Sequence, residues 1–413
     1  MGNDVYVAGI GMTRFTTHMD RTYRELCAEA LDQAFKDGDL EKEEIQGVFF
    51  SNSFWGHFEG QHCIRGQCAL RNYGLLGVPI VNVENACASG STGLYMGYLA
   101  LKSGEYDVVL CLGAEKIAHP DKSMSFAAYT GGFDRTDLED TFGLYEELSA
   151  RYEIPMPPDD GLGKSQAMET YGVSARWHMW KYDTTQEHLA KIAVKNRFNG
   201  SLNPLAHWQE TVPLETVMGD RVISYPITRP MCSPIGDGAA AVILVSERYL
   251  SRLKGCAPVR VRAMAHASGY DKRDMEETAD IGQRVAAMAY EKAGLGPEDV
   301  DIAEVHDATA YGELHQTECL GFTPEGTGGE FVELGKSTLD GDLPINTSGG
   351  LISRGHPIGA TGLAQIHELV TQIRRKAGRR QVPKDVRIAL AENGGGILTL
   401  EEASMTITVL EKR

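Results

Sequence analysis

Val81-Asn-Val-Glu-Asn-Ala-Cys87-Ala-Ser-Gly-Ser-Thr-Gly-Leu94 is the segment that carries the clearest structural pattern in the chain. Its pattern predicts an apolar strand, a turn of small residues that carries Cys87, and a helix that follows at once. A glycine-rich counterpart also runs into Thr-Gly-Leu: Asn346-Thr-Ser-Gly-Gly-Leu-Ile-Ser-Arg-Gly-His356-Pro-Ile-Gly-Ala-Thr-Gly-Leu363. In both places a helix follows, and then a strand that begins with Asp-Val. The chain therefore repeats one structural unit.

Earlier segments repeat in the same order, about 255 residues apart. Residues 30–40 and 43–50 match residues 287–295 and 298–305. Each pair has the pattern of an amphipathic helix, a glycine stop, an acidic turn and a buried strand. One helix–turn–strand order can recur by chance in an α/β protein. Two matched pairs of segments that follow each other in the same order along the chain argue against chance. Strands alternating with helices predict parallel sheets that are covered on both faces.

These repeats predict an α/β protein of two duplicated halves. The first half takes residues 1–118 and 225–256, and the second half takes residues 257–413. An insert at residues 119–224 interrupts the first half, and we expect it to be mostly helix and loop. Within it, a helix is predicted from Thr185 to about residue 199.

The overall charge excludes some classes of partner. The 413 residues include 40 Lys+Arg and 57 Asp+Glu, which gives a formal net charge of −17. Nucleic acids and anionic membranes both bind basic faces, so neither is expected as a partner. The longest apolar run, residues 239–245, is far shorter than the roughly 20 residues of a membrane helix. With no secretory signal pattern at the N-terminus, we expect a soluble, cytoplasmic protein.

The eight cysteines are scattered, and free thiols are expected rather than disulfides. Cys63 and Cys68 form a C-x4-C pair beside His62. A zinc site would need a second ligand pair at similar spacing, and the sequence shows none. No metal site is therefore predicted.

Cys87 is the sharpest candidate for chemistry. A thiol between a strand and a helix lies at a helix N-terminus, where the dipole and free N–H groups favour the thiolate and lower the pKa. Its small neighbours leave room for a substrate. The alternative is a buried structural cysteine, which is the commoner state of this residue.

Two histidines are candidate partners of Cys87. His356 stands in the second-half counterpart of the Cys87 turn, so the two could face each other about a pseudo-twofold axis as a nucleophile and its base. His306, in Glu304-Val-His-Asp-Ala-Thr, ends a predicted buried strand, where active-site groups gather in α/β folds. The alternatives are a surface or capping histidine for His356 and a capping His-Asp pair for His306.

A fourth element is Ala391-Glu392-Asn-Gly-Gly-Gly-Ile397. Three glycines after a strand predict a turn whose backbone N–H groups approach a ligand closely and act as oxyanion donors. An ordinary tight turn is the alternative. With no nicotinamide fingerprint and no Walker loop, a thiolate, two histidines and a glycine turn indicate acyl transfer from a thioester.

These elements, in this order, resemble the thiolase superfamily over nearly the whole chain. The Gly-His-Pro-Ile-Gly-Ala-Thr-Gly loop at His356 is the most specific of them. Residues 177–204 resemble the loop domain of the sterol-carrier-protein type of thiolase, and residues 232–242 resemble the strand that closes the first half. The resemblance implies a five-layered α-β-α-β-α fold of two similar halves plus a mostly helical loop domain, and a homodimer.

The resemblance also implies roles. Cys87 would be the acylated nucleophile, His356 its base, and His306 part of an oxyanion hole, with a second hole at the N–H groups of Cys87 and Gly394. Coenzyme A would be a co-substrate that enters along the loop domain, with no tightly bound cofactor. Its binding is expected at the glycine-rich positions and their neighbour, namely Gly355, Asn393, Gly394 and Gly395.

One departure concerns the second, acid/base cysteine of ordinary thiolases. The two positions where the family places it hold Glu392 and Ala308 here, and Cys319 lies too far beyond His306 to substitute obviously. The proton would then pass through His306, His356 or Glu392. Members with these features resemble thiolases that work with a small zinc-ribbon/OB-fold subunit, some of which degrade branched or aromatic acyl-CoAs such as benzoylsuccinyl-CoA.

The leading hypothesis is cleavage of a 3-oxoacyl-CoA by coenzyme A through a Cys87 acyl-enzyme. Another enzyme on the same fold is the first alternative, either a retro-aldolase or a Claisen-condensing enzyme. The second alternative is a non-catalytic acyl-CoA or lipid carrier subunit, for which the missing second cysteine is the sole support.

Overall fold

A computed structural model describes residues 4–152 and 166–413. Within these residues the main sheet has nine strands in the order β3-β2-β4-β7-β1-β8-β11-β10-β9. The strands of the first half are β1 (Val5–Met12), β2 (Gly47–Ser51), β3 (Ile80–Val83), β4 (Val108–Glu115) and β7 (Gly238–Ser246). Those of the second half are β8 (Val259–Ser268), β9 (Ile302–Glu304), β10 (Ile388–Leu398) and β11 (Glu401–Glu411).

The strand order confirms the duplication. From the junction outward, the first half runs β1, β7, β4, β2, β3, and the second runs β8, β11, β10, β9. Ile345 then forms an isolated parallel bridge with Ala303 of β9, in the position that β3 occupies in the first half. The halves join where β1 pairs with β8.

The prediction of wholly parallel sheets is wrong. β2 is parallel to β3 and β4, and β9 is parallel to β10, but β7 and β11 are antiparallel to both of their neighbours. β11 follows β10 after only two residues, as a hairpin. Such a connection reverses the chain, whereas a parallel neighbour requires a longer crossover.

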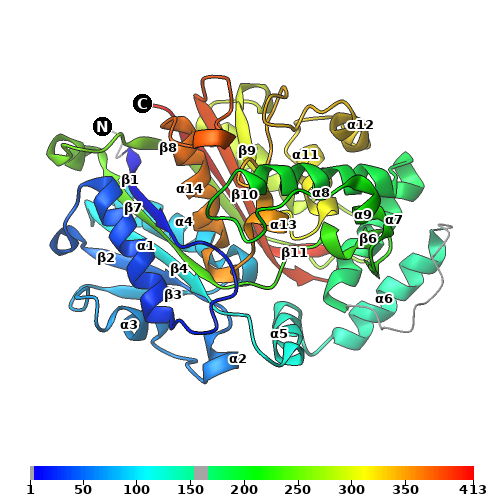
Figure 1. Ribbon diagram of the computed structural model, residues 1–413, viewed down its shortest axis with the longest axis horizontal. Coiled ribbons are helices and arrows are strands. Elements are labelled where there is room, and N and C mark those ends of the chain that lie inside the picture. The colour runs from blue at the N-terminus through cyan, green and yellow to red at the C-terminus, as the bar shows by residue number, and fades with distance from the viewer. Residues whose placement is uncertain (1–3, 153–165) are drawn as a thin grey trace.

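Five layers result, as the resemblance implied. α4 (Ser89–Lys102) and α14 (Thr361–Ile373) pack against each other between the two halves of the sheet, and Figure 1 shows them at the centre of the molecule. α1 (Tyr23–Gly38) packs on the outer face of the first half together with α3 (Arg65–Leu70). α10 (Ile281–Ala293) covers the outer face of the second half, and α11 (Ala310–Cys319) lies beside α10.

Local sequence explains where the repeated outer helices begin and end. Thr22 and Glu25 form a capping box at the start of α1, and Asp280 caps α10 through the N–H of Gly282. α10 stops at Gly294 in a left-handed conformation, as predicted, whereas α1 ends on Asp39 with φ 51° rather than on a glycine. Asp tolerates this region better than most residues.

The segment between β4 and β7 holds α5 (Lys122–Tyr129), α6 (Leu138–Arg151), α7 (Gln166–Tyr182), α8 (Gln186–Ser201), α9 (Leu214–Gly219), β5 (Val222–Ser224) and β6 (Ile227–Thr228). Figure 1 shows α6 to α9 gathered on one side, next to α11. Thr185 caps α8, as predicted. α8 packs on α11, on α12 (Gly328–Glu333) and on α13 (Gly350–Arg354). The bounds given for the three domains stay a prediction.

In the part of the chain that the structure describes, no helix combines the length and apolarity needed to cross a bilayer.

Glycines let the two central helix starts meet backbone to backbone. A Cβ atom on Gly113 of β4 would lie 2.1 Å from the carbonyl oxygen of Gly359, and one on Gly90 of α4 would lie 2.9 Å from the same oxygen. A Cβ on Gly362 would lie 2.5 Å from the backbone nitrogen of Ser91. Any side chain at these positions would push the Cys87 and His356 segments apart.

Gly113→Ala should therefore destabilise the protein by about 3 kcal/mol, because neither the strand nor the opposing peptide can yield cheaply. Urea unfolding followed by circular dichroism measures the change. Gly143→Ala is the matched control, since the site in α6 has no neighbour within 4 Å of an added Cβ. That variant should be neutral or slightly stabilising. Equal stability of the two variants would contradict the contact.

Candidate active site

The structure brings Cys87, His306 and His356 together from distant parts of the chain. The Cys87 sulfur and one ring nitrogen of each histidine all lie within 4.8 Å of one another. Cys87 sits on a short 3-10 turn (Ala86–Ala88) directly before α4. The turn is unusual because Ala86 has a φ of 46°, a region that costs energy for a residue with a Cβ.

His356 has the protonation pattern of a base. Its Nδ1 lies 2.7 Å from Thr361 Oγ1, which itself donates to the carbonyl of Pro357 at 3.1 Å. Because the hydroxyl proton is used there, Nδ1 is the donor, and Nε2 keeps its lone pair. Nε2 finds no hydrogen-bond partner among the described residues. Burial, and then the neighbouring His306 and the positive charge of Arg354, hold the pKa of His356 well below its usual range, so the ring is neutral.

His306 has the opposite arrangement. Its Nδ1 accepts from the Asn393 amide at 2.9 Å, so its proton is on Nε2. Burial lowers the pKa of His306 to about 3. The rings of His306 and His356 meet edge to face with centroids 5.2 Å apart. One neutral ring therefore offers a lone pair, and the other offers an N–H donor.

Glu392 contacts this cluster only through the backbone. Its Oε2 accepts from the N–H of His306 at 2.8 Å, and its buried Oε1 has no hydrogen-bond partner in the described residues. Burial raises the pKa of Glu392 to about 8, so the carboxyl group is mostly protonated at neutral pH. The group of three around Cys87 does not include it. Glu392 thus positions His306 and holds a proton nearby.

The glycine turn predicted at 394–396 is not a turn. These residues continue β10, with Gly394 and Gly395 paired to Met405 and Ser404 of β11. A Cβ on Gly395 would lie 2.2 Å from the Ala88 nitrogen, so the strand runs directly under the Cys87 turn. The N–H groups of Gly396 and Cys87 reach the sulfur, and Gly394 instead faces Glu402. The hairpin partner β11 keeps this segment extended.

The other residues predicted to bind coenzyme A make contacts inside the protein instead. Both side-chain atoms of Asn393 are used, one on His306 and one accepting from Ser91 at 2.8 Å. Gly355 is buried, with a φ of 107° that favours glycine, and packs against Phe15. Thr361, which fixes the His356 ring, was missed by sequence reasoning, although its place in the repeated Thr-Gly-Leu was a usable signal.

The prediction of a lowered thiol pKa is wrong for this state of the protein. Burial raises the pKa of Cys87 to about 12, and the favourable N–H groups of Gly396 and Cys87 only partly offset it. The negative charges of Glu115 and Glu84 oppose ionisation further. Cys87 and His356 therefore rest as a neutral thiol and a neutral imidazole, and the proton moves only when a reaction demands it.

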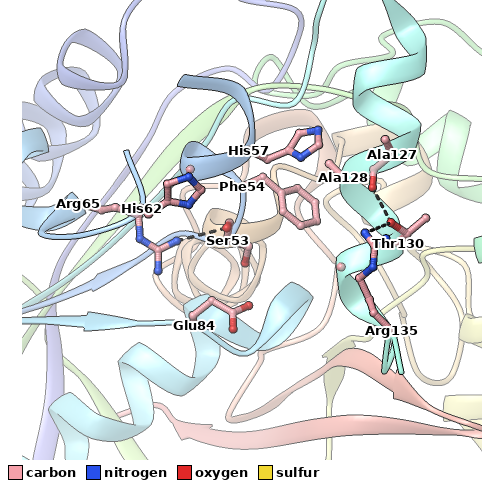
Figure 2. Close-up of a pocket in the computed structure, with 12 residues that line it drawn as sticks. Ser53, Phe54, His57, His62, Arg65, Glu84, Ala127, Ala128, Thr130 and Arg135 are labelled. Atoms are coloured by element: carbon pink, nitrogen blue, oxygen red, sulfur yellow. Dashed lines mark hydrogen bonds between the residues drawn. The ribbon is translucent and has the colours of Figure 1, made fainter. Parts of the chain in front are cut away.

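A cavity of about 640 Å³, lined by two arginines and by Glu84, lies beside the Cys87 turn. Figure 2 shows Arg65, His57 and His62 along one side and Arg135 on the other. Phe54 lines the cavity and packs in one apolar cluster with Cys87. Arg65 is held by the carbonyl of Asn52 at 2.6 Å, whereas the Arg135 guanidinium lies on an exposed segment.

A second cavity has a volume of about 300 Å³. Its lining includes Ile397, next to the Gly396 that contacts Cys87, and three aromatic side chains, Tyr171, Trp177 and Tyr311. Tyr171 is near enough for the charge of a Cys87 thiolate to raise its pKa further. The Cys87 turn thus lies near both this aromatic cavity and the cavity lined by two arginines.

Comparison with known families defines the class of protein. The thiolase N-terminal domain matches residues 5–225, and the thiolase C-terminal domain-like family matches residues 262–411. This chain belongs to the thiolase family.

Similar proteins span nearly its full length. Sterol carrier protein 2 of Oryctolagus cuniculus is 35% identical over 96% of this chain and 71% of the relative. Acetyl-CoA acetyltransferase of Methanothermobacter thermautotrophicus is 36% identical, with 95% and 96% covered. Benzoylsuccinyl-CoA thiolase subunit BbsB of Thauera aromatica is 33% identical, with 95% and 94% covered.

Solved structures share the fold. The Ltp2-ChsH2(DUF35) aldolase superposes with a TM-score of 0.75 at 23% identity, covering 100% of this chain and 98% of that one. Human mitochondrial 3-ketoacyl-CoA thiolase gives a TM-score of 0.67 at 18% identity, with 99% of both chains covered.

Alkylation of Cys87 by iodoacetamide should accelerate continuously from pH 6 to pH 10, because the thiolate fraction of a group with a pKa of about 12 keeps rising over that range. Peptide mass spectrometry measures the rate at each cysteine, with the exposed Cys63 as the internal reference. A rate that levels off below pH 8 would show a thiolate–imidazolium pair instead.

Glu392→Gln should stabilise the protein, and more at pH 8 than at pH 5. The folded carboxyl keeps its proton up to about pH 8, whereas an unfolded one loses it above about 4.5, so the wild type loses stability across this window. Because Gln does not titrate, the stability gained by the variant over the wild type should be at least about 1 kcal/mol larger at pH 8 than at pH 5. Urea unfolding at both pH values measures it, with Glu43→Gln at an exposed carboxyl as control. An equal gain in stability at both pH values would contradict a raised pKa of the Glu392 carboxyl group.

Proposed function

We propose that this chain is a thiolase that cleaves a 3-oxoacyl-CoA with coenzyme A through an acyl-enzyme on Cys87. The observation that carries the proposal is the buried cluster in which a thiol meets a neutral histidine with a free lone pair and a second histidine that offers an N–H. A nucleophile, its base and an oxyanion donor are the groups that acyl transfer requires.

In the first half-reaction, His356 Nε2 takes the thiol proton as the Cys87 sulfur attacks the 3-keto carbon. The carbonyl oxygen becomes negative and accepts from His306 Nε2–H. Collapse of this intermediate breaks the bond between C2 and C3, which leaves an acyl group on sulfur and a carbanion at C2 of the departing thioester. The N–H groups of Gly396 and Cys87 are the backbone donors next to the sulfur.

The proton that His356 has taken can return to that carbanion, which releases the departing thioester as the first product, while the shortened acyl group stays on the Cys87 sulfur until the second half-reaction. Coenzyme A then attacks the acyl-enzyme, His356 accepts its thiol proton, and Cys87 leaves as the restored thiol. This route uses no second cysteine. Glu392 supports it by fixing the backbone of His306, and its protonated state keeps a negative charge away from the developing carbanion.

Coenzyme A would reach Cys87 through the cavity of Figure 2. Its phosphates are anionic, and Arg135 and His57 supply positive or polar groups at the cavity wall. The wall includes residues 127–135, so this route agrees with entry along the loop domain.

An aromatic or branched acyl group is the substrate that the second cavity favours, because Tyr171, Trp177 and Tyr311 line it. Benzoylsuccinyl-CoA is one such compound, and a relative that is 33% identical is named for it. The same name calls that relative a subunit, which supports a partner such as the small zinc-ribbon/OB-fold protein. The exposed Val81 on the edge strand β3 favours a homodimer formed along that edge.

Incubation with a panel of 3-oxoacyl-CoAs, benzoylsuccinyl-CoA included, should leave a covalent adduct on the wild type and none on Cys87→Ser. Acylation needs the sulfur, so we expect activity of the variant to fall at least 10³-fold, by analogy with losses of other catalytic nucleophiles. Intact-mass spectrometry after an acid quench measures the adduct, and its mass identifies the acyl group.

Cys63→Ser is the matched control, since it removes an exposed thiol and should acylate like the wild type. Retro-aldol cleavage of a hydroxyacyl-CoA that survives in Cys87→Ala would show an aldolase instead. Tight binding of acyl-CoA without turnover or adduct would show a carrier subunit.

A further inference from the structure

A second cluster of reactive side chains lies on the wall of the aromatic cavity. His315 and Cys319 stand four residues apart on α11, so both project from one face of the helix. Asp280 reaches them from the start of α10, where its Oδ1 caps the helix at Gly282 N and its Oδ2 points to His315. One atom of each side chain lies within 4.8 Å of the other two.

The spacing of these atoms fits a tetrahedral metal site. Cys319 Sγ lies 3.5 Å from His315 Nε2, and His315 Nε2 lies 3.4 Å from Asp280 Oδ2. Zinc bound at its usual distances to sulfur, nitrogen and oxygen would separate the first pair by about 3.5 Å and the second by about 3.3 Å. The sulfur also lies 3.9 Å from Nδ1, which places it beside the imidazole ring rather than on the lone-pair axis of Nε2, so the Cys319 side chain must rotate to close on an ion.

The same distances argue against a nucleophile–base–acid triad. In a triad the histidine uses one ring nitrogen for the nucleophile and the other for the acid. Here Nε2 is the nearer nitrogen to the Cys319 sulfur and also faces Asp280, while Nδ1 lies farther from the sulfur, at 3.9 Å. The thiol and the carboxylate thus both lie nearest to the same ring nitrogen. The ring of His315 is held there by stacking on Tyr311, with centroids 5.5 Å apart.

We propose that Asp280, His315 and Cys319 bind a zinc ion whose fourth coordination position opens into the aromatic cavity. All three residues line that cavity. Glu402 lines it as well. The positive charge of the nearby Lys272 acts on Asp280, although its ammonium donates to the carbonyl of Thr278 at 3.0 Å and pairs with Glu401 at 3.8 Å.

The cluster around Cys87 is a poorer site for the same ion. It has two histidines and a thiol but no carboxylate, and the buried Arg354 raises the positive potential at both rings. A dication there would meet positive charge from Arg354, whereas a dication at Asp280 meets an anionic oxygen.

Cobalt(II) titration of the metal-stripped full-length protein tests the site, because a thiolate ligand gives a charge-transfer band and tetrahedral geometry gives intense d–d bands. We expect one equivalent per chain, displaced by zinc. Cys319→Ser should remove the charge-transfer band, and His315→Gln should weaken zinc binding at least 100-fold in a chelator competition. Asp280→Asn keeps the helix cap but loses the charge, and should weaken binding at least tenfold.

Cys87→Ser and Cys63→Ser are the matched controls and should bind cobalt like the wild type. Circular dichroism confirms that each variant is folded, and Asp280→Asn remains informative even where Cys319→Ser does not fold. The proposal is overturned when the wild type shows no tetrahedral cobalt spectrum. It is equally overturned when the spectrum survives both Cys319→Ser and Asp280→Asn, or disappears in Cys87→Ser. None of these outcomes depends on turnover of an acyl-CoA.

Discussion

The peptide of Gly359 lies against Gly113 and Gly90 with no room for a side chain on either. This contact fixes the distance between the halves at the point where α4 and α14 begin, and so it places Cys87 and His356 on opposite sides of one small space. A glycine in β10 continues the arrangement, because Gly395 lets that strand pass beneath the Cys87 turn. Backbone packing, which tolerates almost no change in volume, thus sets the geometry of the site.

The reactivity of Cys87, His306 and His356 depends on which atom of each neutral side chain carries the proton. Burial and Arg354 prevent either histidine from charging, and burial keeps Cys87 a thiol. The two histidines differ in the hydrogen bond at Nδ1. In His356 the Nδ1–H donates to the Thr361 hydroxyl, whereas in His306 Nδ1 accepts from the Asn393 amide. Two hydrogen bonds therefore give the rings opposite roles. Acid or base character is assigned by tautomer rather than by charge, which spares a buried site the cost of holding ions.

The two clusters of histidine and cysteine differ in character. At Cys87 the histidine offers its free nitrogen to the sulfur and is held through the other, an arrangement for moving a proton. At Cys319 one nitrogen faces sulfur and carboxylate together, an arrangement for holding a cation. Burial also raises the pKa of Glu392 to about 8 and that of Glu402 to about 7.

The duplication, the layered α/β fold and the identity of the reactive loops could be predicted from the sequence, because hydrophobic periodicity and small-residue turns are local signals. The repeated Thr-Gly-Leu even related Cys87 to His356. The remaining features depend on contacts between distant segments. β11 kept residues 394–396 in a strand, surrounding protein reversed the expected pKa shift of Cys87, and folding brought Asp280 beside a histidine and a cysteine far along the chain. Pairing, desolvation and long-range proximity depend on neighbours in space, which spacing along a chain does not encode.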